Sequence, residues 1–175
     1  PASMNQVEYF GRGPAENYLD RNAGSMVGLY KSTAEELYFP YVRPQENGHH
    51  TDTRWVSLST GKKGLLIQAD NTIGFNALRN SIEDFDDEEA TGLSRQWSNF
   101  TPEQVANHDE AAAKNVLRRQ HHINDITPRD FVEVCVDLKQ QGVAGYDSWG
   151  SRPEPAYTLP ANREYNWGFT LIPLK

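Results

Sequence analysis

The sequence predicts an all-β protein, an antiparallel β-sandwich, and three observations lead to this prediction. Most apolar segments are short and rich in Val, Tyr, Phe, Trp and Ile, the residue types that favour strands. Gly, Pro, Asn or Asp bounds most of these segments, as is usual between strands. Two segments also alternate apolar and polar side chains, which is typical of antiparallel strands with one face on a core.

Eight segments are candidate strands. In chain order they are 7–10, 26–31, 36–42, 53–58, 65–69, 74–78, 131–138 and 165–172. The last two have the clearest alternation. The apolar residues that share a face are Val132, Val134, Val136 and Leu138 in the first of these, and Tyr165, Trp167, Phe169 and Leu171 in the second. Both segments are expected to bury that face on the core.

One helix start is convincing. Thr101 can cap a helix, Pro102 suits the first helical position and Gln104 completes a capping box, so a short helix is predicted from Pro102 to about His108. The acidic run 83–89 is predicted to be a solvated loop.

Length and charge narrow the class of protein. The 175 residues suffice for one domain, 1–175, with a real core. Acidic residues outnumber basic ones by 24 to 17, and the absence of a basic stripe argues against nucleic acid as a partner. No apolar run reaches about 18 residues, so a soluble protein without a membrane partner is expected. Cys135 is the only cysteine, which excludes an internal disulfide and a cysteine-based zinc site.

Three dense motifs could carry function. They are GRGPAENYLDR at 11–21, PYVRPQENG at 40–48 with Arg54-Trp55 after it, and GYDSWG at 145–150. Gly and Pro of the first motif would shape a tight turn, and Asn47-Gly48 is a hairpin-turn signal. Arg43 or Arg54 could clamp a carboxylate. Two interpretations of the first two motifs remain open: they hold loops against the sheet through buried Arg–carboxylate and Tyr contacts, or they bind a ligand.

Trp149 stands apart because it lies in a Gly-rich loop, between Ser148 and Gly150, without the alternating partners of a strand. An exposed indole offers a flat apolar face of the kind against which sugars pack their C–H groups. The sequence therefore predicts that Trp149 binds a ligand, and burial in the sandwich is the alternative.

No metal site is predicted. His49-His50 and His121-His122 are adjacent pairs, and neighbours on a strand point to opposite faces, so these histidines are expected at the surface or in hydrogen bonds. The acidic run lacks the glycine that a calcium loop needs at its sixth position.

Together the three motifs resemble the C-terminal β-sandwich domain of the large β-galactosidases of glycoside hydrolase family 2. In that family a strand leads into Gly-x-Gly-Pro-x-Glu-Asn-Tyr-x-Asp-Arg, a Pro-Tyr-x-x-Pro-x-Glu-Asn-Gly segment follows, and an Asp-Ser-Trp loop precedes the final strands. All three occur here in this order, between Val7 and Trp149. The resemblance implies a supersandwich of the galactose-mutarotase-like kind. Family domains are longer on the N-terminal side, so the chain is expected to hold only part of the full domain.

The resemblance also implies a function for the parent enzyme. Such enzymes hydrolyse terminal non-reducing β-D-galactosides with retention, using two Glu residues of a separate TIM-barrel domain that binds magnesium and often sodium. No motif of that catalytic pair occurs in this chain. The resemblance therefore implies no catalytic residue, metal ligand or cofactor here, and no activity of the chain alone. The resemblance further implies that Trp149 lies at the active-site rim of the parent, stacked on the sugar, and that Asp147 and Ser148 shape its loop.

The implied partners are the galactoside in the parent's active site and the other domains of a homo-oligomeric parent, in a bacterial cytoplasm or periplasm. Two features depart from the family pattern: Tyr146 stands where many relatives have a small or acidic residue, and 81–96 looks like an insertion. The alternative function is a stand-alone carbohydrate-binding or structural sandwich.

Overall fold

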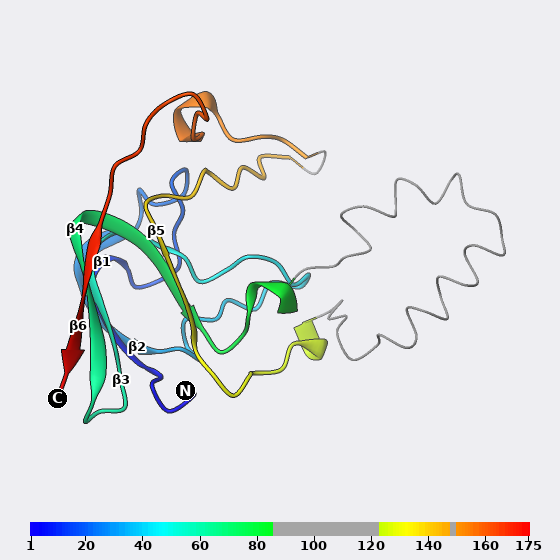
Figure 1. Ribbon diagram of the computed structural model, residues 1–175. Helices are drawn as coiled ribbons and strands as arrows, with labels where there is room; N and C mark the ends of the chain where they lie inside the picture. The colour runs from blue at the N-terminus through cyan, green and yellow to red at the C-terminus, as the bar shows by residue number, and fades with distance from the viewer. Residues whose placement is uncertain (86–122, 148–149) are drawn as a thin grey trace, which may run out of the picture. The chain divides into compact units, whose positions relative to one another are not determined.

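The computed structural model describes residues 1–85, 123–147 and 150–175 (Figure 1). Its strands are all antiparallel and form one six-stranded sheet in the order β2-β1-β3-β4-β5, with β6 also paired to β4. The strands are β1 (Gln6–Gly13), β2 (Met26–Thr33), β3 (His50–Ser59), β4 (Gly64–Leu78), β5 (Glu133–Asp137) and β6 (Phe169–Leu174). The all-β, antiparallel prediction is confirmed.

The chain divides into two compact units. The first comprises Pro1–Phe39, Asn47–Arg79 and Arg129–Lys175 and contains all six strands, and the second comprises Pro40–Glu46 and Asn80–Pro128. The described helices are single 3₁₀ turns: η1 (Ile82–Asp84) and η5 (Ile123–Asp125) in the second unit, and η6 (Pro155–Tyr157) in the first. The helix predicted after Thr101 lies outside the described residues.

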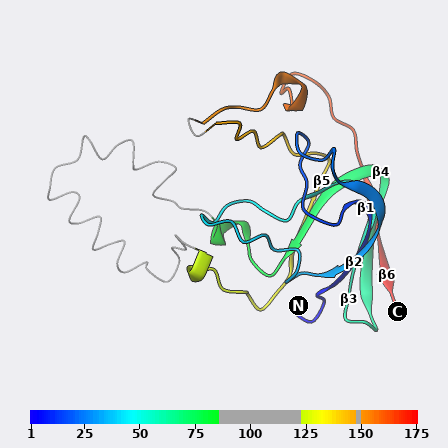
Figure 2. The same cartoon turned by 180° about the vertical axis from the view of Figure 1, so that it is seen from behind.

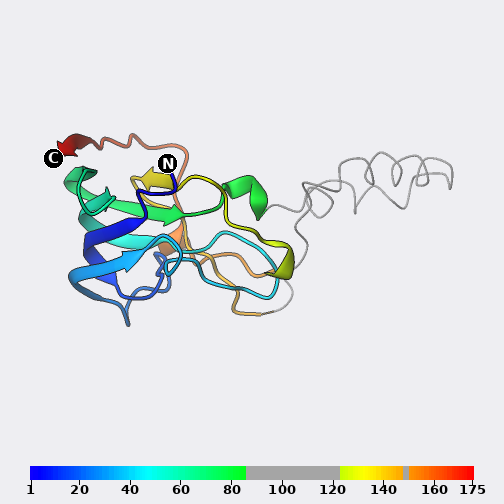
Figure 3. The ribbon, with the colours of Figure 1, turned by 90° about the horizontal axis from the view of Figure 1, so that it is seen from below.

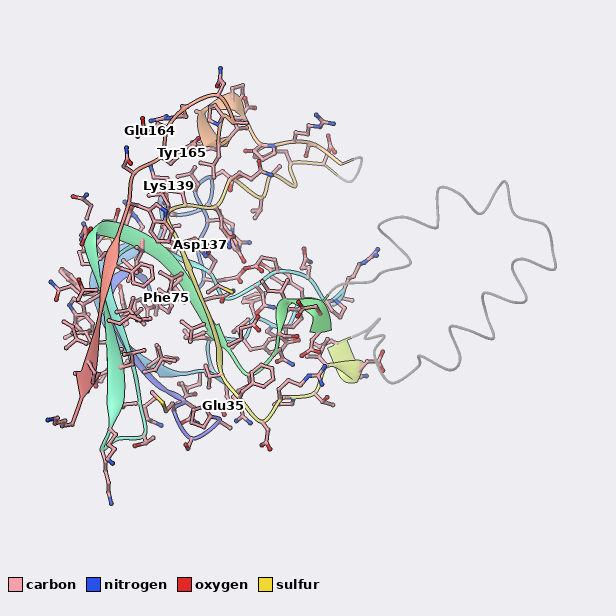
Figure 4. All side chains as sticks on the ribbon, in the orientation of Figure 1. Glu35, Phe75, Asp137, Lys139, Glu164 and Tyr165 are labelled. Atoms are coloured by element: carbon pink, nitrogen blue, oxygen red, sulfur yellow. The ribbon has the colours of Figure 1, made fainter. Side chains whose placement is uncertain are left out.

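The core of the first unit is built around Tyr9. Along β1 every second residue is buried, and Val7 and Tyr9 are each only 1% exposed. The Tyr9 ring lies 5.1 Å from the ring of Phe75 and 4.8 Å from that of His50, between centroids. Aromatic pairs at these separations add to the free energy gained from burial. Figure 4 labels Phe75 on the inner side of the curved β4.

A bend in the sheet brings these rings together. The register of β3 with β4 shifts twice, between His50 and Thr53 and between Thr53 and Trp55, as expected of β-bulges, which bend strands. Val56 of β3 is the cross-strand partner of Tyr9, and His50, at the start of the same strand, contacts the Tyr9 ring. Both ends of β3 thus border the core around Tyr9, and Figure 3 shows the strands from below.

The glycines of the first motif lie in a strand and not in the tight turn that the sequence suggested. A Cβ atom on Gly13 would meet the Tyr9 hydroxyl and the Tyr30 ring, so only glycine lets these side chains pack against β1. The turn begins after β1, at Pro14, which follows a cis peptide bond.

Most strand predictions are confirmed, and three are corrected here and below. Segments 65–69 and 74–78 form one strand, β4, and the predicted strand 36–42 is absent. In that segment the backbone N–H of Leu37 donates to the Thr33 carbonyl at 3.0 Å. The N–H of Phe39 donates to the Asn47 side chain, also at 3.0 Å. Local bonds therefore satisfy groups that a neighbouring strand would have paired, and Asn47-Gly48 makes no hairpin.

Apolar side chains are exposed on both faces of the first unit. The predicted core face of 165–172 is exposed, because Trp167, Phe169 and Leu171 are 45%, 39% and 54% accessible, and β6 itself begins only at Phe169. The sheet face that turns away from Tyr9 is called the outer apolar face. Its exposed residues are Phe10, Val27, Leu29 and Leu174.

Candidate functional site

The Trp149 loop is the name used here for residues 142–151. It follows β5 in the first unit, and the structure describes 142–147 and 150–151 of it. Ser148 and Trp149 lie outside the described residues. The predicted roles of these two residues therefore stay predictions, and the described flanks define the site.

The flanks of the loop have an unusual backbone. Ala144, Gly145 and Gly150 have φ angles of 56°, 85° and 84°, in the left-handed region. Glycine adopts this region readily, whereas for alanine it is unfavourable by about 1–2 kcal/mol. Contacts with the rest of the unit must therefore hold Ala144 in place.

Ser151 closes the loop on its C-terminal side. Its hydroxyl oxygen accepts hydrogen bonds from the backbone N–H groups of Tyr146, at 3.0 Å, and Asp147, at 3.4 Å. The N–H of Gly142 donates to the carbonyl of Tyr157 at 2.7 Å and ties the start of the loop to η6. Asp147 was expected to shape the loop, and its backbone takes part in this closure.

Asp20 holds the N-terminal side of the loop. Its Oδ1 accepts a hydrogen bond from the N–H of Val143 at 3.0 Å, and its Oδ2 accepts one from the N–H of Ala144 at 2.8 Å. A Cβ atom on Gly142 would collide with the same carboxylate. Figures 1 and 2 show the segment after β1 beside the segment after β5, so the first motif meets the third. Sequence reasoning missed both Asp20 and Ser151.

Glu16 ties the first motif to the second. Its side chain is only 4% exposed, and Oε1 lies 2.5 Å from Nη2 of Arg21. Its Oε2 accepts a hydrogen bond from the N–H of Gly48 at 2.7 Å. Asn17 adds a second link, because its side-chain Oδ1 accepts hydrogen bonds from both the backbone N–H and the hydroxyl of Thr51. These contacts agree with the structural interpretation of the two motifs, although the Arg21 side chain is 51% exposed.

Arg12 and Arg21, which the sequence did not single out, both pair with carboxylates. Arg12 pairs with Asp52 at 2.6 Å, beside the bulge of β3. For Arg54 the prediction is wrong, because its guanidinium donates to the backbone carbonyl of Asp52 and lies 5.6 Å from the centroid of the Phe10 ring. The pairing residue could not be chosen from the sequence, since several arginines stand near acidic residues.

His49 and His50 are both 1% exposed. His50 is hydrogen-bonded as expected: its Nδ1–H donates to the Arg12 carbonyl at 3.1 Å. For His49 the expectation is wrong, because neither ring nitrogen has a hydrogen-bond partner among the described residues, and the ring stacks on Tyr18 at 5.5 Å. Burial, together with the His50 ring, lowers the pKa of His49 to about 4. Burial also lowers the pKa of His50 to about 4, although the hydrogen bond to the Arg12 carbonyl and the charge of the Glu16 carboxylate act to raise that pKa.

Two hollows lie in the first unit. A partly enclosed cavity of about 70 Å³ is lined by His49, Asp52 and Lys139, among others, and Figure 4 labels Lys139 just after β5. A more open hollow of about 460 Å³ is lined by Glu16, Asp20 and Arg21 of the first motif, by 23–25 and by Phe39. The larger hollow therefore borders the residue that holds the Trp149 loop.

The described residues contain no cluster of three or more His, Cys, Asp or Glu side chains that could hold a metal ion. The acidic run is described only to Phe85, and there the loop prediction is wrong in part. Asp84 is 2% exposed and its carboxylate accepts a hydrogen bond from the Ser81 N–H at 3.1 Å. None of the helices in the described ranges is long and apolar enough to cross a membrane.

The class of protein that these features define is an antiparallel β-sandwich domain whose first and third motifs meet at one built loop. Comparison with known proteins gives the family. The family model described as the β-galactosidase small chain matches residues 1–171. The chain belongs to this β-galactosidase family.

Relatives with the name β-galactosidase agree with this assignment. The protein of Priestia megaterium is 34% identical over 174 residues, which cover 99% of this chain and 14% of that protein. The protein of Vibrio cholerae is 29% identical over 171 residues, covering 98% and 13%. That of Arthrobacter sp. is 39% identical over 90 residues, covering 48% and 9%. The chain thus spans about one seventh or less of the length of these relatives.

Proposed function

We propose that this chain is the C-terminal β-sandwich domain of a retaining β-galactosidase and that it completes the galactoside site with Trp149. In this proposal the indole stands at the rim of the active site and stacks on the sugar. Its contribution is binding and positioning, because an indole cannot donate a proton to the glycosidic oxygen.

The observation that carries the proposal is the anchoring of the chain on both sides of Trp149. Asp20 holds 143 and 144 before it, and Ser151 binds the backbone at 146 and 147 from the residue after Gly150. A binding platform needs a backbone of fixed geometry, since an ordered side chain contributes affinity without a large loss of entropy on binding.

The acidic residues of the chain support a role outside catalysis. A retaining glycosidase needs two carboxyl groups about 5–5.5 Å apart, one of them an acid with a raised pKa. Here Glu16 and Asp52 pair with arginines, and Asp20 binds backbone N–H groups. Burial acts to raise the pKa of Glu35, but hydrogen bonds from Arg79 and Asn5 outweigh it and lower that pKa. The catalytic pair and the ions that serve it are therefore assigned to the barrel of the parent, with magnesium and often sodium.

The outer apolar face supports the assignment to a larger chain. Leu29 is 62% exposed and Val27 is 41% exposed, and their cross-strand neighbours Phe10 and Arg12 lie on the same face. Contiguous exposed apolar surface of this kind usually marks a contact with another protein surface. The proposed contact is with other domains of the parent enzyme.

The test is Trp149→Ala in the full-length enzyme that carries this domain. Loss of the platform should weaken substrate binding by about 1–3 kcal/mol, which appears as a raised KM. The change in kcat should be smaller, since the contact serves substrate and transition state alike. Trp149→Phe should lose less, because part of the flat face remains. Steady-state kinetics with a chromogenic galactoside measure both constants, and the chain assayed alone should show no turnover.

The melting temperature of each variant separates this role from the alternative. If Trp149 is buried in the sandwich, Trp149→Ala lowers the melting temperature and leaves KM of the folded enzyme unchanged. That result would refute the platform.

A further inference from the structure

Asp20 is the residue through which the first motif reaches the Trp149 loop, across 123 residues of sequence. Both of its carboxylate oxygens are used, one by Val143 and one by Ala144. Successive backbone N–H groups that converge on one anion form a nest, and hydrogen bonds to an ionised acceptor are stronger than neutral ones. The contact is therefore suited to hold a backbone conformation that is unfavourable by itself.

The conformation that it holds is the left-handed turn at Ala144. Ala144 has a φ of 56°, and the next residue, Gly145, has a φ of 85°. Without an anion facing their N–H groups, residues 143 and 144 would gain nothing from this geometry and would lose it readily. The turn reverses the local backbone at Ala144 and Gly145, within the described part of the Trp149 loop.

Asp20 itself is held firmly. It lies at the tip of a tight turn closed by Tyr18 and Arg21, whose backbone groups bond to each other at 2.8 Å and 3.4 Å. Arg21 is tied to the buried Glu16, and Glu16 to the N–H of Gly48, just before β3. A continuous series of contacts thus leads from the sheet to the base of the loop.

We propose that Asp20 is a positioning residue of the galactoside site, which fixes the backbone of Val143 and Ala144 and so directs Trp149 toward the sugar. This inference rests on the proposed function of Trp149. Both carboxylate oxygens of Asp20 bind backbone N–H groups of the loop, so in this proposal its effect passes through the loop. The proposal gives the Asp of the first motif a task that the motif alone does not indicate.

The test is a double-mutant cycle in the full-length enzyme, with Asp20→Ala, Trp149→Ala and the double variant. Asp20→Ala should raise KM about three- to tenfold and change kcat less, because the platform is less often in its binding position. In the Trp149→Ala background the same change should have almost no effect on KM. Asp20→Asn should fall between, since one amide oxygen still accepts and the amide NH₂ faces a donor.

Glu35→Ala is the matched control. Glu35 also holds a loop, since it accepts hydrogen bonds from Arg79, at 2.6 Å, and from Asn5. Arg79 in turn binds the carbonyls of Arg129 and Phe131, which precede β5, whereas the Trp149 loop follows β5. Glu35→Ala should lower the melting temperature as Asp20→Ala does and leave KM unchanged.

Hydrogen exchange gives a readout that is independent of turnover. In the full-length enzyme the amides of Val143 and Ala144 should exchange faster in Asp20→Ala than in the wild type, and keep their wild-type rate in Glu35→Ala.

The outcomes separate the two proposals. Equal KM changes for Asp20→Ala in the wild-type and Trp149→Ala backgrounds would overturn the positioning role alone. So would an unchanged KM in Asp20→Ala beside a raised KM in Trp149→Ala. An unchanged KM in Trp149→Ala refutes the platform, and with it the inference that depends on it.

Discussion

The two faces of the sheet contrast sharply although the same strands make both. On the inner face Tyr9, Val56 and Phe75 are at most 1% exposed and pack ring against ring or side chain against side chain. The outer apolar face holds Phe10, which follows Tyr9 in β1, and Leu29, which pairs with Phe10 from β2. Their side chains are 37% and 62% exposed. The inner face is buried around Tyr9, whereas the outer apolar face exposes apolar side chains along β1 and β2.

This difference shows that apolar content and burial are separate properties of a strand. A strand that is apolar on both sides fits a protein in which both faces are covered. The described residues of this chain cover only the part of the inner face around Tyr9. The stability of the chain alone should depend on the inner face, while the outer face should matter once the rest of the parent is present.

The largest expected effect is a loss of stability in acid, which arises from the two buried histidines, His49 and His50. The pKa of both His49 and His50 is about 4 in the folded chain, against about 6.5 when unfolded. Between these values the unfolded chain binds protons that the folded chain refuses, so stability is full above pH 6.5 and falls as pH drops toward 4. The loss should reach roughly 3 kcal/mol for each ring.

Urea unfolding between pH 7 and 4 measures this loss. His49→Phe keeps a flat ring and should remove about half of the pH dependence, because His50 remains. A variant with the full wild-type dependence would show that the His49 ring titrates normally.

The next effect distinguishes the faces by truncation. Phe75→Ala removes a fully buried ring that contacts Tyr9 and His50, and should lower the free energy of unfolding by about 3–5 kcal/mol. Phe10→Ala, a ring of the same size on the outer apolar face, should cost clearly less in the chain alone. Similar losses for the two variants, measured by denaturant unfolding, would contradict the contrast between the faces.

The smallest effect sharpens the comparison by changing the context. Leu29→Ser should change the stability of the chain alone by no more than about 0.5 kcal/mol, because Leu29 is largely exposed. In the full-length enzyme the same change should cost about 1.5–3 kcal/mol if the outer apolar face is covered there. Met26→Ser, at a residue of β2 that is 72% exposed and lies on the other face, is the control and should be neutral in both contexts. Equal effects of Leu29→Ser in chain and enzyme would remove the support for this contact.

Much of the fold could be predicted because local patterns determine it. The segment 7–10, with Val, Tyr and Phe followed by Gly and Pro, predicts the strand β1 from local composition alone. The segment 36–42 misled for the opposite reason: its Tyr, Phe and Val favour a strand, but Thr33 and Asn47 satisfy its backbone locally. The merging of two predicted strands into β4 depends on the bulge opposite Thr53, which no local pattern reveals.

The candidate site was predictable only in its position along the chain. The Gly-rich context of Trp149 marks the loop, and the density of the first motif marks Asp20 as one of several polar residues. That the two belong together depends on a contact between residues 123 positions apart, which the topology creates. The burial of the His49 ring, without a hydrogen-bond partner among the described residues, could not be predicted for a similar reason. A His-His pair on a strand does not indicate which of its rings the folded chain will bury.

The length of β4 has a consequence for how this protein can vary. On one edge β4 pairs with β3, and on the other it pairs end to end with β6, up to Ala69, and with β5, from Gly74. The whole excursion 138–168, which includes the Trp149 loop, therefore leaves and returns at neighbouring points of a single strand. Closing a longer loop between fixed ends costs little, about 0.6 kcal/mol for each doubling of its length. Insertions and deletions between these two ends can therefore reshape the Trp149 loop while the sheet keeps its hydrogen bonds.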